Sequence, residues 1–215
     1  MADQDHWLQR VRYTAAEPSS WLLHARTLRQ AAEDLWRAGN AHAKTPGSEL
    51  GATVLVSWKS PDAPEMPDTG GSTREVCFML FGYALENLVK GIIVCRDPTL
   101  VTEKRLRRWD KRGHRLIALF ADAGIQLDES ELNLLGRVTR MTEWKGRYPV
   151  PLDFSKTDPQ SDAVIGSLVV TSRWPVEDYE GLVDIYEKTV VELKRTMSEN
   201  PPLPADHDFG TSVKK

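Results

Sequence analysis

Apolar residues recur at helical spacing in five segments of the chain. The spacing predicts helices over residues 20–37, 74–95, 114–123, 129–146 and 175–197. In the second segment the apolar side chains lie on every face, which is typical of a helix at the centre of a bundle. Four of the five helices are long enough to pack side by side, and no run of alternating strands is evident. The pattern therefore predicts an all-α helical bundle with an extra short helix.

Several residues mark the ends and the contacts of these helices. Asp128 is followed three residues later by Glu131, so the two predict a capping box at the start of the fourth helix. Pro175 is suited to the first turn of the last helix. Gly82 and Gly91 lie inside the second helix, where each costs about 1 kcal/mol relative to alanine. We therefore expect each of them at a point where a neighbouring helix crosses closely.

The helices leave long connections between them. The length of 215 residues favours one domain, predicted over residues 1–198. Within it, residues 40–73 are rich in proline and glycine and predict an excursion with long loops. Residues 152–173 are polar with an apolar insert that could be a strand or a short helix. The proline-rich tail, residues 199–215, is predicted to be disordered.

Charge is unevenly distributed along the chain. The net charge is −3, yet residues 104–115 hold seven basic residues against one aspartate. Such a segment with an aromatic residue inside it can bind phosphates and stack a base. It could equally be a solvated interhelical loop, or a surface for an acidic partner. The candidate nucleic-acid-binding residues are Arg105, Arg107, Arg108, Trp109, Lys111 and Arg112.

Three residues are candidates for chemistry. Glu86 and Lys90 are spaced i,i+4 in the most apolar helix, where a buried carboxylate needs a partner. That partner could be Lys90 or Arg147. The resulting pair could have a structural role, fixing the register of the helix, or it could form part of a functional polar centre. His114 follows Gly113 and begins a helix, where a polar residue is usually a cap; the alternative is an acid–base role. The catalytic candidates are Arg147, Glu86 and His114.

Other classes of site lack their sequence signals. The chain has no nucleophile elbow, no phosphate-binding loop and no dinucleotide fingerprint, and its five histidines form no cluster. Cys77 and Cys95 are 18 residues apart on one predicted helix, about 27 Å, too far for a disulfide. The longest apolar run has ten residues, too few to span a bilayer. We expect no cofactor, no metal site, no membrane contact and a cytoplasmic location.

Three short motifs resemble the HEPN family (higher eukaryotes and prokaryotes nucleotide-binding): ALENLVK at 84–90, GHRL at 113–116 and WKGRYP at 144–149. The resemblance implies an up-and-down antiparallel four-helix bundle, usually a homodimer, linked to RNA cleavage, toxin–antitoxin pairs and defence. Active members carry an arginine and a histidine separated by four to six residues; the arginine holds phosphate and the histidine acts on the ribose 2′-hydroxyl. Here no histidine follows Arg147 at that spacing. Arg108 and His114 have the spacing but span a loop and a helix start.

Three functions follow as hypotheses. The first is a HEPN-like homodimer that binds RNA or a nucleotide, as an accessory of a toxin–antitoxin or defence system, without the usual ribonuclease motif. The second is a metal-independent endoribonuclease with a non-standard site: Arg147 or Arg108 on the phosphate, with His114 or Glu86 as the base. The third is a non-catalytic interaction module for a protein partner encoded nearby.

Overall fold

The computed structural model describes residues 2–43, 70–102, 113–145, 162–165, 168–171 and 174–201. Within these ranges the protein is mostly helical, so the all-α class is confirmed. One short antiparallel hairpin, β1 (Asp162–Ile165) with β2 (Leu168–Thr171), is the exception, and it makes the apolar insert of residues 152–173 a strand pair. The helices are α1 (Ala2–Ala16), α2 (Pro18–Ala43), α3 (Gly70–Arg96), α4 (Leu116–Asp122), α5 (Glu129–Arg140) and α6 (Val176–Glu199).

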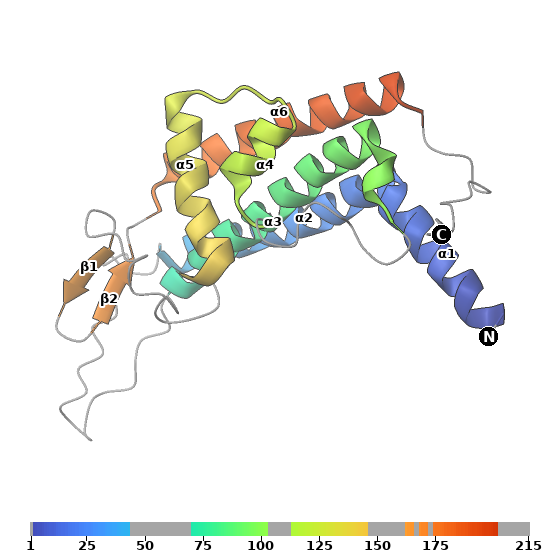
Figure 1. Cartoon of the computed structure of the whole chain (residues 1–215). Coiled ribbons are helices and arrows are strands. Elements are labelled where there is room, and N and C mark those ends of the chain that lie inside the picture. Colours follow the sequence, from blue (N-terminus) through green and yellow to red (C-terminus); the bar gives the residue numbers. More distant parts are fainter. Residues whose placement is uncertain are drawn as a thin grey trace.

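Helix α3 is the central element, as its apolar pattern predicts. It packs against α2, α4, α5 and α6, and the side chains of Phe78, Phe81, Leu85, Leu88 and Ile92 are fully buried. Figure 1 shows α2, α3 and α6 lying side by side, with α4 and α5 covering one side. Among the described residues, Glu75–Arg96 is long and apolar enough to cross a membrane, but 67% of its apolar window is buried inside the fold. Core helices of soluble proteins pass the same test.

Contacts at the two ends of α3 give the helix directions. Trp21, near the start of α2, packs on Gly91 near the end of α3, and Trp36 meets Phe78 edge-on at the opposite end. Helix α2 is therefore antiparallel to α3. Helix α6 begins beside Phe81, through Tyr179, and ends beside Arg96, so it runs in the same direction as α3. Helix α5 crosses these helices at a steep angle (Figure 1).

Both glycines inside α3 lie at close helix crossings, as predicted. A Cβ atom at Gly82 would lie 2.4 Å from Cγ2 of Thr142, just after α5. A Cβ atom at Gly91 would lie 2.9 Å from Cβ of Trp21 on α2. Real side chains essentially never approach so closely, so the absence of a side chain allows each neighbour to contact the α3 backbone.

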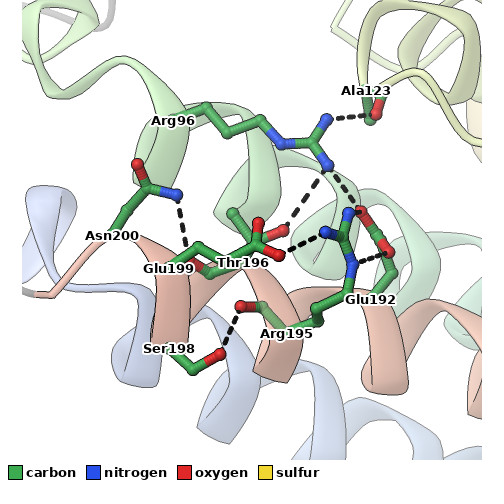
Figure 2. Close-up of polar contacts among 8 residues, drawn as sticks. All are labelled: Arg96, Ala123, Glu192, Arg195, Thr196, Ser198, Glu199 and Asn200. Atoms are coloured by element: carbon green, nitrogen blue, oxygen red, sulfur yellow. Dashed lines mark hydrogen bonds and ion pairs between the residues drawn. The ribbon is translucent and has the colours of Figure 1, made fainter.

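An arginine at the end of α3 joins three elements. Figure 2 shows the Arg96 guanidinium donating to the carbonyl of Ala123, after α4, and to Glu192 on α6, both at 2.5 Å. Thr196 is a further acceptor at 3.5 Å. At the other end of α6, Tyr179 stacks on Trp36 and meets Phe81 edge-on. Both ends of α6 are therefore fixed against the core.

Several predicted boundaries need correction. Helix α1 was not predicted, because only Ala15 and Ala16 pack into a core cluster while Trp7 and Val11 stay exposed, so little apolar periodicity marks it. Helix α2 continues past Gly39, and α3 begins at Gly70, so both ends of the 40–73 excursion are helical. The rest of that excursion, and residues 202–215 of the tail, lie outside the described residues.

The capping box at the start of α5 is confirmed. The Asp128 carboxylate accepts from the Glu131 amide at 2.8 Å, and the Glu131 carboxylate accepts from the Asp128 amide at 2.9 Å. These bonds satisfy backbone donors that the helix itself leaves unpaired. Helix α5 then passes into a π-helical turn, Met141–Lys145, which packs against α3.

Candidate functional site

A buried carboxylate on α3 is the centre of the candidate site. The Glu86 side chain is 9% exposed, and its Oε1 accepts a hydrogen bond from Lys90 Nζ at 2.5 Å. The two residues are one helical turn apart, so the predicted pair of Glu86 and Lys90 is confirmed. The charges compensate each other, which is the condition for placing them inside an apolar core.

The second oxygen of the same carboxylate contacts a histidine. His114 Nδ1 lies 2.8 Å from Glu86 Oε2, although the two residues are 28 positions apart in the chain. Two of the three catalytic candidates are therefore brought together. The interpretation of His114 as a helix cap is wrong: the N-cap of α4 is Arg115, and His114 instead reaches α3. The Arg115 side chain makes no capping hydrogen bond at the start of α4.

A tyrosine and a π-helical turn border the histidine. The Tyr83 ring lies edge-on to the His114 ring, with 6.2 Å between the ring centroids. The Tyr83 hydroxyl donates to the carbonyl of Thr142 at 3.3 Å. Beside them, Arg115 Nε lies 3.7 Å from Glu143 Oε1. Turns of the π type are frequent at functional sites, and this one fixes Tyr83 next to the imidazole.

The geometry defines what the imidazole can do. A carboxylate at Nδ1 favours the tautomer that carries the hydrogen on Nδ1, which leaves the lone pair of Nε2 for an incoming proton. The same carboxylate stabilises the imidazolium that forms when Nε2 takes up the proton. The His114 side chain is half exposed, so a ligand can reach it. The arrangement is an acid–base group oriented by Glu86.

The thiols of the core do not contribute to this site. Burial raises the pKa of Cys77 to about 12, and burial also raises the pKa of Cys95. Both are free cysteines on α3, which agrees with the prediction that they form no disulfide. At neutral pH these buried thiols stay protonated, so neither is a candidate nucleophile.

The other predicted site residues lie outside the described part of the chain. These are the catalytic candidate Arg147 and the basic-segment residues Arg105, Arg107, Arg108, Trp109, Lys111 and Arg112. Sequence reasoning missed the Glu86–His114 contact and the role of Tyr83. A signal was available, because Glu86 and His114 belong to two of the three motifs that carry the family resemblance.

The fold and this site define a mostly helical protein whose central helix carries a buried glutamate shared by a lysine and a histidine. Among the described residues, no three histidine, cysteine, aspartate or glutamate side chains gather closely enough to hold a metal ion. Comparisons of the chain with protein-family models, with curated proteins and with solved structures found no match.

Proposed function

We propose that this protein is a HEPN-like cytoplasmic homodimer that binds RNA or a nucleotide beside Glu86 and His114, as an accessory of a toxin–antitoxin or defence system. The supporting observation is the 2.8 Å contact between these two residues. It joins the ALENLVK and GHRL motifs, on which the resemblance rests, into one polar site. The antiparallel directions of α2 and α3 support the up-and-down four-helix bundle that the proposal includes, whereas the steep crossing of α5 departs from it.

The charge around the site suits a phosphate backbone. The basic segment, residues 104–115, leads directly into His114 and contains Arg115, whose side chain is 58% exposed. Basic side chains that neutralise phosphates release counterions, so binding weakens as salt concentration rises. The protein as a whole is acidic, and the attraction must therefore come from this segment rather than from the overall charge.

The test is a binding titration with fluorescein-labelled single-stranded RNA, followed by anisotropy from about 50 to 200 mM salt. We expect the double variant R107E/R108E to weaken binding and to lower the salt slope by about 2, because two phosphate contacts are lost. Arg26→Glu on the exposed face of α2 is the matched control and should bind as the wild type. An absence of binding at the lowest salt would remove this function. Binding that charge reversal leaves unchanged would favour the interaction module with a protein partner encoded nearby.

A second function, a metal-independent endoribonuclease, is favoured by the same dyad. In this reaction His114 Nε2 accepts the proton of the ribose 2′-hydroxyl, and the 2′-oxygen attacks the adjacent phosphorus. The bond from phosphorus to the 5′-oxygen breaks, and the leaving oxygen takes a proton from solvent. The products are a 2′,3′-cyclic phosphate and a 5′-hydroxyl. Glu86 is then a positioning residue that holds the imidazole.

Cleavage of end-labelled RNA separates this function from binding alone. General acid–base catalysis contributes about 10²–10⁴-fold, so His114→Ala should reduce the cleavage rate, measured at saturating protein, by at least about a hundredfold. Glu86→Gln should give a smaller loss with a changed pH profile. A substrate with one 2′-deoxy ribose should resist cleavage at that position. Equal cleavage by the wild type and His114→Ala would exclude the dyad as the catalyst.

A further inference from the structure

An open groove lies between α1 and α2, and neither Glu86 nor His114 lines it. Its volume is about 570 Å³, which falls within the range of small-molecule sites. Trp7 and Val11 of α1 line one wall, Trp21 and His24 of α2 line the other, and Asn87 of α3 lies between them. Neither the family resemblance nor the proposed dyad uses this groove.

The walls of the groove offer flat aromatic surface. Trp7 is 61% exposed, which is unusual for so large an apolar side chain. Trp21 is held in place, because its indole Nε1 donates to the carbonyl of Ala15 at 2.8 Å. One indole is therefore accessible and the other is fixed, an arrangement suited to stacking a planar ring.

The charge of the groove favours an anion. Among the described residues that line the groove, Arg10 and His24 are the ones that can carry a charge, and none of them is acidic. This contrasts with the acidic balance of the whole chain, −3. A planar ring with an attached anionic group, such as a base with its phosphate, complements this combination of indoles and a guanidinium.

The groove adjoins the dyad through one face of α3. Asn87 follows Glu86 in the chain, and its Nδ2 donates to the carbonyl of Tyr83 at 2.7 Å. The Tyr83 ring in turn lies beside His114. At 3.6 residues per turn, Tyr83, Glu86, Asn87 and Lys90 share one face of the helix. Asn87 therefore connects the groove to Tyr83, the residue that borders the His114 ring.

We propose that this groove is a nucleotide subsite, in which Trp7 stacks on a base and Arg10 contacts the phosphate. The inference rests on the proposed function and deepens it, because it names the part of the protein that holds a base beside the α3 dyad. The nucleotide is one unit of a single-stranded RNA whose neighbouring phosphate reaches the dyad, or a free mononucleotide. The two sources share the same chemistry.

The experiment measures the binding of fluorescein-labelled single-stranded RNA and, separately, of fluorescent AMP. Trp7→Ala should weaken binding about tenfold, because it removes the aromatic ring on which a base would stack. Trp7→Phe keeps a ring, so its affinity should stay within about threefold of the wild type. Arg10→Gln should weaken binding and lower the salt slope by about 1. Leu23→Ala, 67% exposed on α2 outside the groove, and Arg26→Gln are the matched controls. Trp7 is exposed, so its variants should fold, which circular dichroism checks.

The outcomes separate this inference from the proposed function. If R107E/R108E weakens RNA binding but Trp7→Ala matches Leu23→Ala for both ligands, the function stands and the subsite is refuted. If only AMP binds, and Trp7→Ala abolishes that binding, the subsite is supported and RNA is not its ligand. If the wild type binds neither RNA nor AMP, both proposals fail.

Discussion

The Glu86 carboxylate serves two partners, and substitution can separate them. Glu86 and Lys90 have side chains that are 9% and 13% exposed, whereas His114 is half exposed. Removing one partner of a fully buried ion pair costs about 3–5 kcal/mol, because the other charge is left uncompensated. Lys90 retains some exposure and its long stem can reach water, so we expect about 2–3 kcal/mol for Glu86→Ala.

The companion substitutions give smaller losses. Glu86→Gln keeps an amide oxygen that accepts from Lys90, so about 1–2 kcal/mol is expected. His114→Ala removes a half-exposed side chain and should cost less than about 1 kcal/mol. The double variant E86Q/K90M removes both charges at nearly constant volume and should be close to the wild type in stability. The single variant K90M leaves the Glu86 carboxylate without its ammonium partner and should cost about 1–2 kcal/mol as well. With the double variant near zero, the predicted coupling energy between Glu86 and Lys90 is therefore about 2–4 kcal/mol.

Urea denaturation of the wild type, E86Q, K90M and E86Q/K90M, with Glu86→Ala and His114→Ala beside them, measures the free energy of unfolding of each protein. Additive losses, or a Glu86→Ala variant within about 0.5 kcal/mol of the wild type, would refute the argument that Lys90 depends on Glu86. RNA binding measured on the same samples reports the other role of the carboxylate. It should fall with His114→Ala, although that variant is the most stable of the single ones.

Two further predictions concern the core. Gly91→Ala should lower the free energy of unfolding by about 1–2 kcal/mol, because the clash with the backbone-anchored Trp21 Cβ exceeds the gain in helix propensity. Gly136→Ala should raise the free energy of unfolding by up to about 1 kcal/mol, because the nearest neighbour of the added Cβ is 3.8 Å away. Thermal or urea denaturation measures both. Burial raises the pKa of Cys77 from 9.0 to about 12. In the native protein at about pH 8 this thiol should therefore resist alkylation by iodoacetamide, and in urea it should react. Because the folded protein keeps this thiol protonated, the stability it contributes is complete below pH 9.0 and is lost as pH rises toward about 12. Destabilisation by Gly136→Ala, or rapid alkylation of native Cys77, would contradict these two predictions.

The periodic part of the fold could be predicted from the sequence. Helices with a strong apolar face, α2 and α6, and the all-round apolar α3 lie where the spacing predicts helices, although α2 continues to Ala43 and α3 begins at Gly70. The crossings at Gly82 and Gly91 were predicted too, because glycine in a helix interior is costly unless a neighbour needs the space. Interactions between residues close in the sequence determine these features, so the sequence pattern is sufficient to predict them.

Features that depend on tertiary contacts could not be predicted in this way. Helix α1 has a weak apolar face, and on α5 the periodicity does not indicate that Leu132 is exposed while its neighbour Leu134 is buried against the core. The contact of His114 with Glu86 spans 28 positions and depends on where the loop before α4 lies against α3. Each feature is set by the packing of separate elements, about which periodicity carries no information.

A charged pair in the most buried helix calls for a physical explanation. For stability alone, well-packed apolar side chains of similar volume serve as well as a buried ion pair, or better. Lys90 therefore explains how Glu86 is tolerated, but not why a carboxylate is there. The contact to His114 supplies a reason, since an apolar residue cannot fix a tautomer or stabilise an imidazolium. If E86Q/K90M is as stable as the wild type but has lost the activity that His114 supports, the pair belongs to the site; if it retains that activity, Glu86 has a structural role only.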